Sequence, residues 1–256
     1  MAGEAKTNAF MLGTATVMLG APADLFNLTP AANSIGLTKN FKLDASATYI
    51  KLGQGIQNKT VHSTKTGNDI MATMEAYEYT AKNLTYALGL DGYNAGAAIT
   101  ASTTISVKTS STVFSVLSAV GLVVGRYITI QTGYQDQVVV RKIAAIAGVS
   151  ITVDLPVANL AVGQTVSACN LIPIGSDKDD VFLSAYVVGT LADKSEVGIL
   201  LPKVKVTKGF SLLFGSTDYQ NLPLELTIYD QIPADPHYAR FQADFGGAPA
   251  AIVTRT

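Results

Sequence analysis

The sequence has a single cysteine, Cys169, and only two histidines, His62 and His237. One cysteine cannot form an internal disulfide framework or a cysteine-rich zinc or iron–sulfur site. Two histidines cannot supply a three-histidine metal centre, and they leave few candidates for histidine-based catalysis. The sequence therefore disfavours an enzyme, and it predicts no metal or cofactor site.

Charged residues and long hydrophobic runs are also scarce. Lys and Arg total 18 against 19 Asp and Glu, a net charge of −1, and charged residues make up 14% of the chain. This balance excludes a strongly basic nucleic-acid-binding surface and a polybasic membrane binder. The longest weakly polar run, Val113–Gly125, has 13 residues, fewer than the roughly 20 of a membrane-spanning helix. Residues 9–20 are similar to the apolar centre of a signal peptide, but Glu4 precedes them, which favours an N-terminal arm.

Short blocks rich in Thr, Ser, Gly and Val predict a mainly β fold. Residues 41–49 alternate apolar and polar side chains, as in a half-buried strand. Ile50 and Leu52 break this phase and predict a bulge or a strand end. Residues 53–68 are polar and rich in Gly, Lys and Thr, so we expect a loop there, followed by a second strand at 69–79.

One short helix is expected at Ala81–Leu88. Thr80 can cap its N-terminus, and Gly89 is placed to end it in a left-handed conformation. The residues predicted to share its apolar face are Leu84, Ala87 and Leu88. A helix of about two turns is not stable alone in water, so it must pack on a sheet.

The composition changes between residues 97 and 175, where 79 residues carry only six charges. Five short strands are expected in this region, at 104–109, 126–132, 137–145, 150–154 and 165–172. Their close spacing, with glycines between them, predicts a small β-barrel or sandwich. We therefore expect a small β domain at 95–175, inserted into a discontinuous domain made of 1–94 and 176–256.

Beyond residue 176 the first pattern returns. Val181–Leu191 and Val197–Thr207 predict a hairpin, and Leu222–Tyr229 predicts a further alternating strand. The tail, Asp230–Thr256, contains several prolines, glycines and small residues, and we expect it to form an extended C-terminal arm.

No motif for catalysis or ligand binding is complete. Gly53-Gln54-Gly55 lacks the third glycine and the strand–turn–helix context of a dinucleotide site, and Asp177–Asp180 lacks the last acidic ligand of an EF-hand. Cys169 alternates with apolar neighbours and is expected to be a small core residue. His62 and His237 are expected to be structural or interface residues rather than ligands.

The predicted strands would leave sheet edges exposed. Free edges invite aggregation unless they are paired or covered, and a long polar loop and two extended ends are costly to order alone. Copies of the same chain can supply the missing partners, because edge-to-edge pairing closes a ring and head-to-tail contacts build a filament. The alternative is a monomeric two-domain β protein.

The order of these segments resembles that of bacteriophage tail tube proteins, a family related to the tubes of contractile injection systems. The resemblance rests on the apolar N-terminal arm, the strand Asn40–Lys51, the loop Gly53–Gly67 and the Glu-Tyr-Thr-x-x-Asn-Leu-x-x-Ala-Leu-Gly motif at 78–89. The hairpin at 181–207 and the strand at 222–230 complete it. A minimal tube subunit lacks the insert around 95–175.

This resemblance implies a tail-tube-type β-sandwich or barrel and six subunits per ring. Stacked rings would form a continuous channel that passes double-stranded DNA during genome ejection. The partners would be further copies of the chain, together with other tail proteins at the tube ends. The protein would belong to the virion tail, assembled in the cytoplasm of a bacterial host without membrane insertion, and both termini would lock neighbouring subunits together.

The resemblance also implies roles for individual residues. The ring-stacking candidates in the loop are Gln54, Gln57, Asn58, Lys59, His62 and Lys65. The channel-facing candidates are Lys42, Asp44, Ser46 and Thr48. A channel that passes DNA should not bind phosphate strongly, so small and mixed polar side chains suit its lining, with Lys42 as a local exception.

The insert would project outward, because inside it would obstruct the channel. A bulky outer domain would hinder a contractile sheath, which favours a non-contractile tail. The alternative function is a virion-surface or secreted binding protein, with the insert as a carbohydrate-binding or adhesion module. Its aromatic residues Phe114, Tyr127 and Tyr134 would form a poor stacking platform, and a hydrolase has no candidate acid–base pair.

Overall fold

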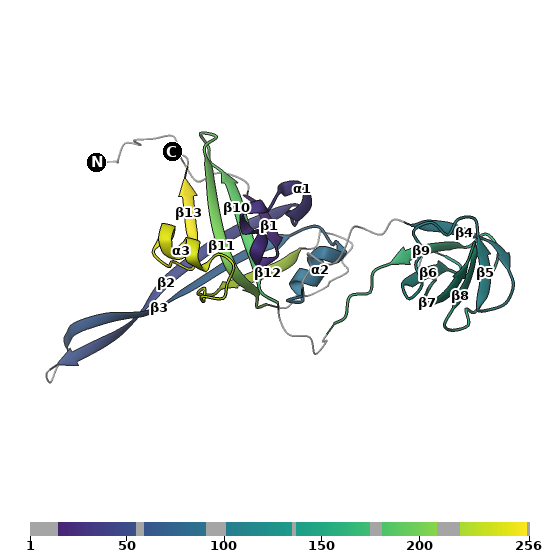
Figure 1. The fold of residues 1–256 in the computed structure, drawn as a ribbon, viewed down its shortest axis with the longest axis horizontal. Helices are drawn as coiled ribbons and strands as arrows, with labels where there is room; N and C mark the ends of the chain where they lie inside the picture. Colours follow the sequence, from purple (N-terminus) through teal and green to yellow (C-terminus); the bar gives the residue numbers. More distant parts are fainter. Residues whose placement is uncertain are drawn as a thin grey trace. The chain divides into compact units, whose positions relative to one another are not determined.

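A computed structural model describes residues 15–54, 59–90, 101–134, 137–174, 181–208 and 221–254. The chain divides into two compact units, a main unit of Met1–Gly96 with Ile174–Thr256 and an inserted unit of Ala97–Pro173. Both units consist mainly of antiparallel strands, which confirms the predicted mainly β fold (Figure 1). The inserted unit covers nearly the range expected from the change in composition.

The main unit is one antiparallel sheet. Its strands lie in the order β1 (Ala15–Gly20), β10 (Leu183–Thr190), β11 (Glu196–Val206), β12 (Leu222–Ile228), β3 (Lys59–Ala76) and β2 (Thr38–Gln54), and β13 (Ala251–Thr254) pairs with the first part of β11. The predicted hairpin at 181–207 is therefore present as β10 and β11, joined by a tight turn in which Leu191 N–H donates to the Ser195 carbonyl at 2.9 Å.

The outer edge of β1 is covered by the chain that leads into β2. Ile35 N–H donates to the Val17 carbonyl at 3.1 Å, and Thr38 Oγ1 donates to the Ala15 carbonyl at 2.9 Å. This stretch follows two short helical segments, η1 (Pro22–Asn27) and α1 (Pro30–Asn33). The edge of β1 that the sequence left open is thus partly closed by the same chain.

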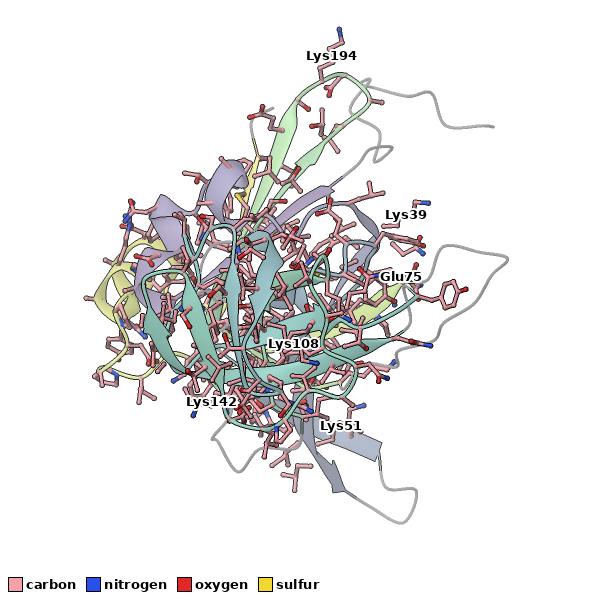
Figure 2. The ribbon with its side chains drawn as sticks, turned by 90° about the vertical axis from the view of Figure 1, so that its right-hand side faces the viewer. Lys39, Lys51, Glu75, Lys108, Lys142 and Lys194 are labelled. Atoms are coloured by element: carbon pink, nitrogen blue, oxygen red, sulfur yellow. The ribbon has the colours of Figure 1, made fainter. Side chains whose placement is uncertain are left out.

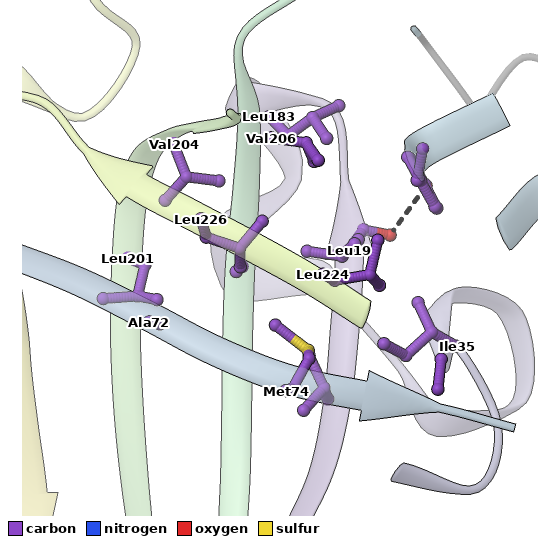
Figure 3. Close-up of a cluster of buried hydrophobic side chains, with 14 of the residues drawn as sticks. Leu19, Ile35, Ala72, Met74, Leu183, Leu201, Val204, Val206, Leu224 and Leu226 are labelled. Carbon is purple, nitrogen blue, oxygen red and sulfur yellow. Dashed lines mark hydrogen bonds between the residues drawn. The ribbon is translucent and has the colours of Figure 1, made fainter. Parts of the chain in front are cut away.

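One face of the sheet forms the hydrophobic core of the main unit (Figure 3). The predicted alternation of β12 is confirmed, because Leu222, Leu224, Leu226 and Ile228 are all buried. Fully burying one such side chain stabilises the fold by about 1.5–3 kcal/mol. The neighbouring strands add Met74, Ala185, Leu201 and Val204 to the same layer.

Helix α2 (Ala81–Ala87) covers part of this core, as predicted. Thr80 Oγ1 accepts from Asn83 N–H at 3.1 Å, and Gly89 ends the helix at φ +73°. The buried face differs from the predicted one: it consists of Asn83, Tyr86 and Ala87, while Leu84 and Leu88 are half-buried.

The polar side chain of Asn83 faces inward because it forms hydrogen bonds there. Its Nδ2 donates to the Ile35 carbonyl and to the Glu78 carbonyl, both at 2.8 Å. Tyr86 is also fully buried, and its hydroxyl donates to the Leu19 carbonyl at 3.1 Å. Both polar groups are thereby hydrogen-bonded to backbone carbonyls, which offsets the cost of burying them.

The inserted unit is a closed six-stranded barrel. Its strands follow one another around the barrel as β4 (Ser102–Lys108), β5 (Val113–Val116), β8 (Ser150–Val153), β7 (Val138–Ala147), β6 (Tyr127–Gln131) and β9 (Thr165–Cys169). All five predicted strands are present, and β5 was missed because its four residues lie inside a run without clear alternation. Cys169 is only half-buried at the end of β9, where burial raises the pKa of its thiol.

The C-terminal segment is not the extended arm that the sequence predicted. It forms helix α3 (Tyr238–Phe245) and then β13, which pairs with β11 of the same chain. Phe241 on α3 packs against Leu25 and Leu200 in a small second core. The segment folds back because some side chains of β11 lie on the face opposite the main core, and the segment buries them.

Lys203 of β11 shows this burial most clearly, because only 9% of its surface is exposed. Its Nζ donates to Asp235 Oδ2 at 2.8 Å and lies 4.6 Å from the ring centre of Phe182. Burial alone would raise the pKa of Asp235. The hydrogen bonds from Lys203 and from the Ile232 N–H, with the charge of Lys203, outweigh burial and lower that pKa.

Removing this carboxylate tests how much the C-terminal cover contributes. At neutral pH, Asp235→Asn should lower the free energy of unfolding by about 2 kcal/mol, because Lys203 is left without its counter-charge. The pKa is lowered in the folded state, so the stabilisation is present above the ordinary carboxyl pKa and is lost as pH falls through the folded value. Urea denaturation of wild type and variant at neutral pH and near pH 3 should show the difference shrinking in acid.

Asp244→Asn is the matched control on α3. Asp244 pairs with Arg240 at 3.5 Å, but both side chains are more than half exposed. Such a pair contributes less than about 0.5 kcal/mol. Equal losses in the two variants would contradict a special role for the Lys203–Asp235 pair.

Candidate self-association site

Strands β2 and β3 continue far beyond the region where they belong to the sheet. Residues 53–68 were predicted to form a loop, and this prediction is wrong: β2 runs to Gln54 and β3 begins at Lys59. The segment at 59–66 is polar on both faces, so it lacks the apolar alternation by which a half-buried strand is recognised. Gln57 and Asn58 lie outside the described residues.

We call residues 46–54 and 59–69 the ribbon. β12 pairs with β3 only over Met71–Ala76, so within the described residues the ribbon has no strand beyond its own two. Where the structure describes the burial of a ribbon residue, that residue is exposed, except for the half-buried Gly67. Nine residues of strand span about 30 Å, and a two-stranded hairpin of this kind is marginally stable by itself.

The ribbon exposes large apolar side chains. Tyr49, Ile50 and Leu52 are 51%, 67% and 61% exposed. Along β2, Ile50 and Leu52 lie on the face opposite to Leu43, which contacts the core. The pairing register shifts between Thr48 and Tyr49 and again between Leu52 and Gly53, so the predicted irregularity near Ile50 and Leu52 is present, although the strand does not end there.

Four of the six predicted ring-stacking residues lie within the described part of the chain, and all four belong to the ribbon: Gln54, Lys59, His62 and Lys65. Gln54 pairs with Lys59 at its last described rung, His62 lies opposite Leu52, and Lys65 lies opposite Tyr49. His62 Nε2 is 3.0 Å from Thr64 Oγ1. The sequence reading missed the apolar members of this surface, although the break in alternation at Ile50 and Leu52 marked their position.

The predicted channel-facing residues divide between two places. Lys42 and Asp44 lie where the sheet is still several strands wide, and their side chains are joined by an ion pair of 2.7 Å. Ser46 and Thr48 lie on the ribbon, on the same face of β2.

Lys42 and Asp44 belong to a polar sheet face opposite the core. Register places Lys42 beside Thr73 and Glu225, and Asp44 beside Met71, Thr227 and Lys205, across β2, β3, β12 and β11. We define this polar sheet face by its members, Lys39, Lys42, Asp44, Met71, Thr73, Glu75, Lys205, Pro223, Glu225 and Thr227. These include three lysines and three carboxylates, so the face has no net charge.

The charges on this face are held by local partners. Glu75 accepts hydrogen bonds from Asn221, Asn40 and Tyr77, which lower its pKa. Tyr77 O–H donates to Glu75 Oε2 at 3.1 Å, and this bond raises the pKa of Tyr77. The Lys39 ammonium lies 4.8 Å from the centre of the Tyr77 ring, and Lys39 and Glu75 lie near each other in Figure 2.

No model of a known protein family matches the chain, and no curated protein matches it. Within the residues that the structure describes, no group of three or more His, Cys, Asp or Glu side chains is arranged to hold a metal ion. In the same part of the chain, no helix is long and apolar enough to cross a membrane.

Shortening the ribbon tests whether it contributes to the stability of the main unit. Residues 47–68 can be replaced by Asn-Gly, which forms a two-residue turn between the paired residues Ser46 and Asp69. Because the core reaches only to Leu43 and Ile70, the free energy of unfolding should change by less than about 1 kcal/mol. Urea denaturation checks this, and a loss of several kcal/mol would show that the ribbon is part of the folded core.

Proposed function

We propose that this protein is a self-assembling structural subunit of a hollow tube, of the kind found in bacteriophage tails. The ribbon is the observation that carries the proposal. A single copy leaves both of its faces and its apolar side chains in water, within the described chain. A second copy docked on the ribbon would cover them.

The polar sheet face suits the lining of the channel. Its lysines and carboxylates balance, and threonines lie between them, so it offers no continuous positive surface for the phosphates of passing DNA. The proposal comprises six-subunit rings, stacked through the ribbon, in the virion tail. Other tail proteins would contact the tube ends, and the inserted barrel would project outward from a non-contractile tube.

The fold corrects one part of the expected assembly. A free C-terminal arm was expected to lock neighbouring subunits, but α3 and β13 pack on their own chain. Among the described segments, the ribbon remains available for contact with a neighbour. The N-terminal arm before Ala15 lies outside the described residues.

A carbohydrate-binding role for the inserted unit has less support. Of its three aromatic residues, Phe114 is buried in the barrel core and Tyr127 is half-buried. Tyr134 alone among these three is well exposed, and one ring is a small platform for stacking on a sugar.

Electron microscopy of concentrated protein should show rings or long hollow tubes. In Ile50→Ser/Leu52→Ser, the apolar contact with the neighbour is lost, and tubes should be absent at concentrations where the wild type forms them. Far-UV circular dichroism should be unchanged, because both side chains are already exposed. A wild-type protein that stays monomeric at high concentration across salt conditions would contradict the proposed function.

Leu117→Ser/Val120→Ser is the matched control. These two side chains of the inserted barrel are 72% and 86% exposed, so the same amount of apolar surface is changed elsewhere. The control should form tubes like the wild type.

A further inference from the structure

One end of the inserted barrel exposes a group of apolar side chains. They belong to the connection between β5 and β6 and to the turn between β7 and β8, and we call them the apolar end: Leu117, Val120, Val123, Val124 and Val149. Leu117 and Val120 are 72% and 86% exposed, and the other three are 48% to 54% exposed. Val116 N–H donates to the Val149 carbonyl at 2.9 Å, which holds the turn beside the start of the connection.

The backbone of the connection between β5 and β6 keeps these side chains in water. Leu122, in its middle, is buried in the barrel core. Leu122 N–H donates to the Ala119 carbonyl and Arg126 N–H donates to the Val123 carbonyl, both at 3.1 Å, so the connection consists of two successive turns. Leu122 thus fills the end of the core, and the apolar residues next to it remain outside.

The apolar end is large enough for a protein contact. Its side chains expose about 500 Å² of apolar surface, as much as the largest patches of typical monomers, which reach roughly 300–600 Å² and are often functional. A stable interface buries about 800 Å² on each partner, and its rim is polar. Two copies that face each other through this end therefore approach the size of a specific interface.

The residues around this end favour a second copy over a lipid surface. Residues 109–125 and 143–153 contain no charged side chain, so two such ends can face each other without opposing like charges. Membrane-binding segments carry aromatic residues and several lysines or arginines beside their apolar side chains. The apolar end contains no aromatic residue, and Arg126 is the one charged residue of the connection between β5 and β6.

We infer that the apolar end binds the same end of a second copy, in a contact with two-fold symmetry. Such a contact is isologous, because both partners use the same surface. It goes beyond the proposed function, which places the tube contacts on the main unit. Under that function, paired barrels would join copies through their inserted units in addition to the ribbon. Tube formation does not depend on this pairing, so Leu117→Ser/Val120→Ser is still expected to form tubes.

The first test measures association of the full chain in the Ile50→Ser/Leu52→Ser background, in which the apolar contact of the ribbon is lost. Sedimentation equilibrium should show that this background associates. Adding Leu117→Ser/Val120→Ser should raise the concentration that gives the same average mass by about tenfold or more, because two apolar side chains leave the contact.

The matched control is Leu155→Ser/Val162→Ser, which changes the same residue types in the connection between β8 and β9. These side chains are 58% and 61% exposed. Association should stay within about twofold of the background, as for ordinary surface substitutions. Raising NaCl from about 0.05 to about 0.5 M should also leave it within about twofold, because salt screens exposed charges but not apolar burial.

Cysteine cross-linking tests which surface is in contact. In a Cys169→Ser background, which removes the native thiol, Val120→Cys should form disulfide-linked dimers under copper–phenanthroline oxidation. A two-fold contact brings equivalent residues of the two copies together. Leu155→Cys should cross-link about tenfold more slowly or less, because only random collisions bring its thiols together.

Three results would overturn this inference. The first is equal association with and without Leu117→Ser/Val120→Ser, and the second is equal cross-linking of the two cysteine variants. The third is co-sedimentation of the chain with phosphatidylglycerol–phosphatidylcholine vesicles that Leu117→Ser/Val120→Ser abolishes, which would assign the apolar end to a lipid surface. Each of these results leaves the proposed function standing if the wild type forms tubes. A wild type without tubes would overturn the proposed function and not the pairing of barrels.

Discussion

A β-strand pair needs a layer against at least one of its faces, and β2 and β3 have one for only part of their length. Near the body, Leu43 and Ala72 lie against the core of the main unit. Over the ribbon, residues 46–54 and 59–69, the same two strands have no covering layer in the described chain. Hydrogen bonds between two strands hardly offset the conformational entropy of ordering them, so burial by a partner is the remaining source of stability. The proposed assembly follows from this constraint.

Within the described residues, several other strand edges are covered at least in part by the same chain. The stretch leading into β2 covers β1, β13 covers the first part of β11, and the inserted barrel is closed on itself. The ribbon differs from these strands, because no other described strand or covering layer lies against it. Lysines on an edge strand oppose indiscriminate pairing with other edges. Lys51 and Lys65 therefore act against random aggregation, while they leave contact with an acidic partner favourable.

The sequence predicted most reliably those elements whose side chains face one apolar and one polar environment. β12 and α2 are of this type, and their alternation and capping residues located them closely. The ribbon was missed because both of its faces are in water, which removes the periodic signal of a strand. The C-terminal segment was missed because its reason for folding back, the cover of Lys203 and Leu200 on β11, depends on residues far away in the sequence. In the sequence, the apolar part of the candidate site was visible only because Ile50 and Leu52 interrupt the alternation of apolar and polar residues.

Two surfaces of the main unit now have distinct chemistries that suit different tasks. On the polar sheet face, lysines and carboxylates alternate with threonines and are held by partners such as Tyr77, so a passing polyanion finds no net attraction. On the ribbon, Lys51, Lys59 and Lys65 stand against a single carboxylate, Asp69 at its base, and Ile50 and Leu52 are exposed. Apolar burial and complementary charge both favour association, so under the proposed function the ribbon would serve binding and the sheet face would serve passage. The same pair of strands, β2 and β3, contributes to both surfaces, and the loss of the core beneath them at residue 46 separates one from the other.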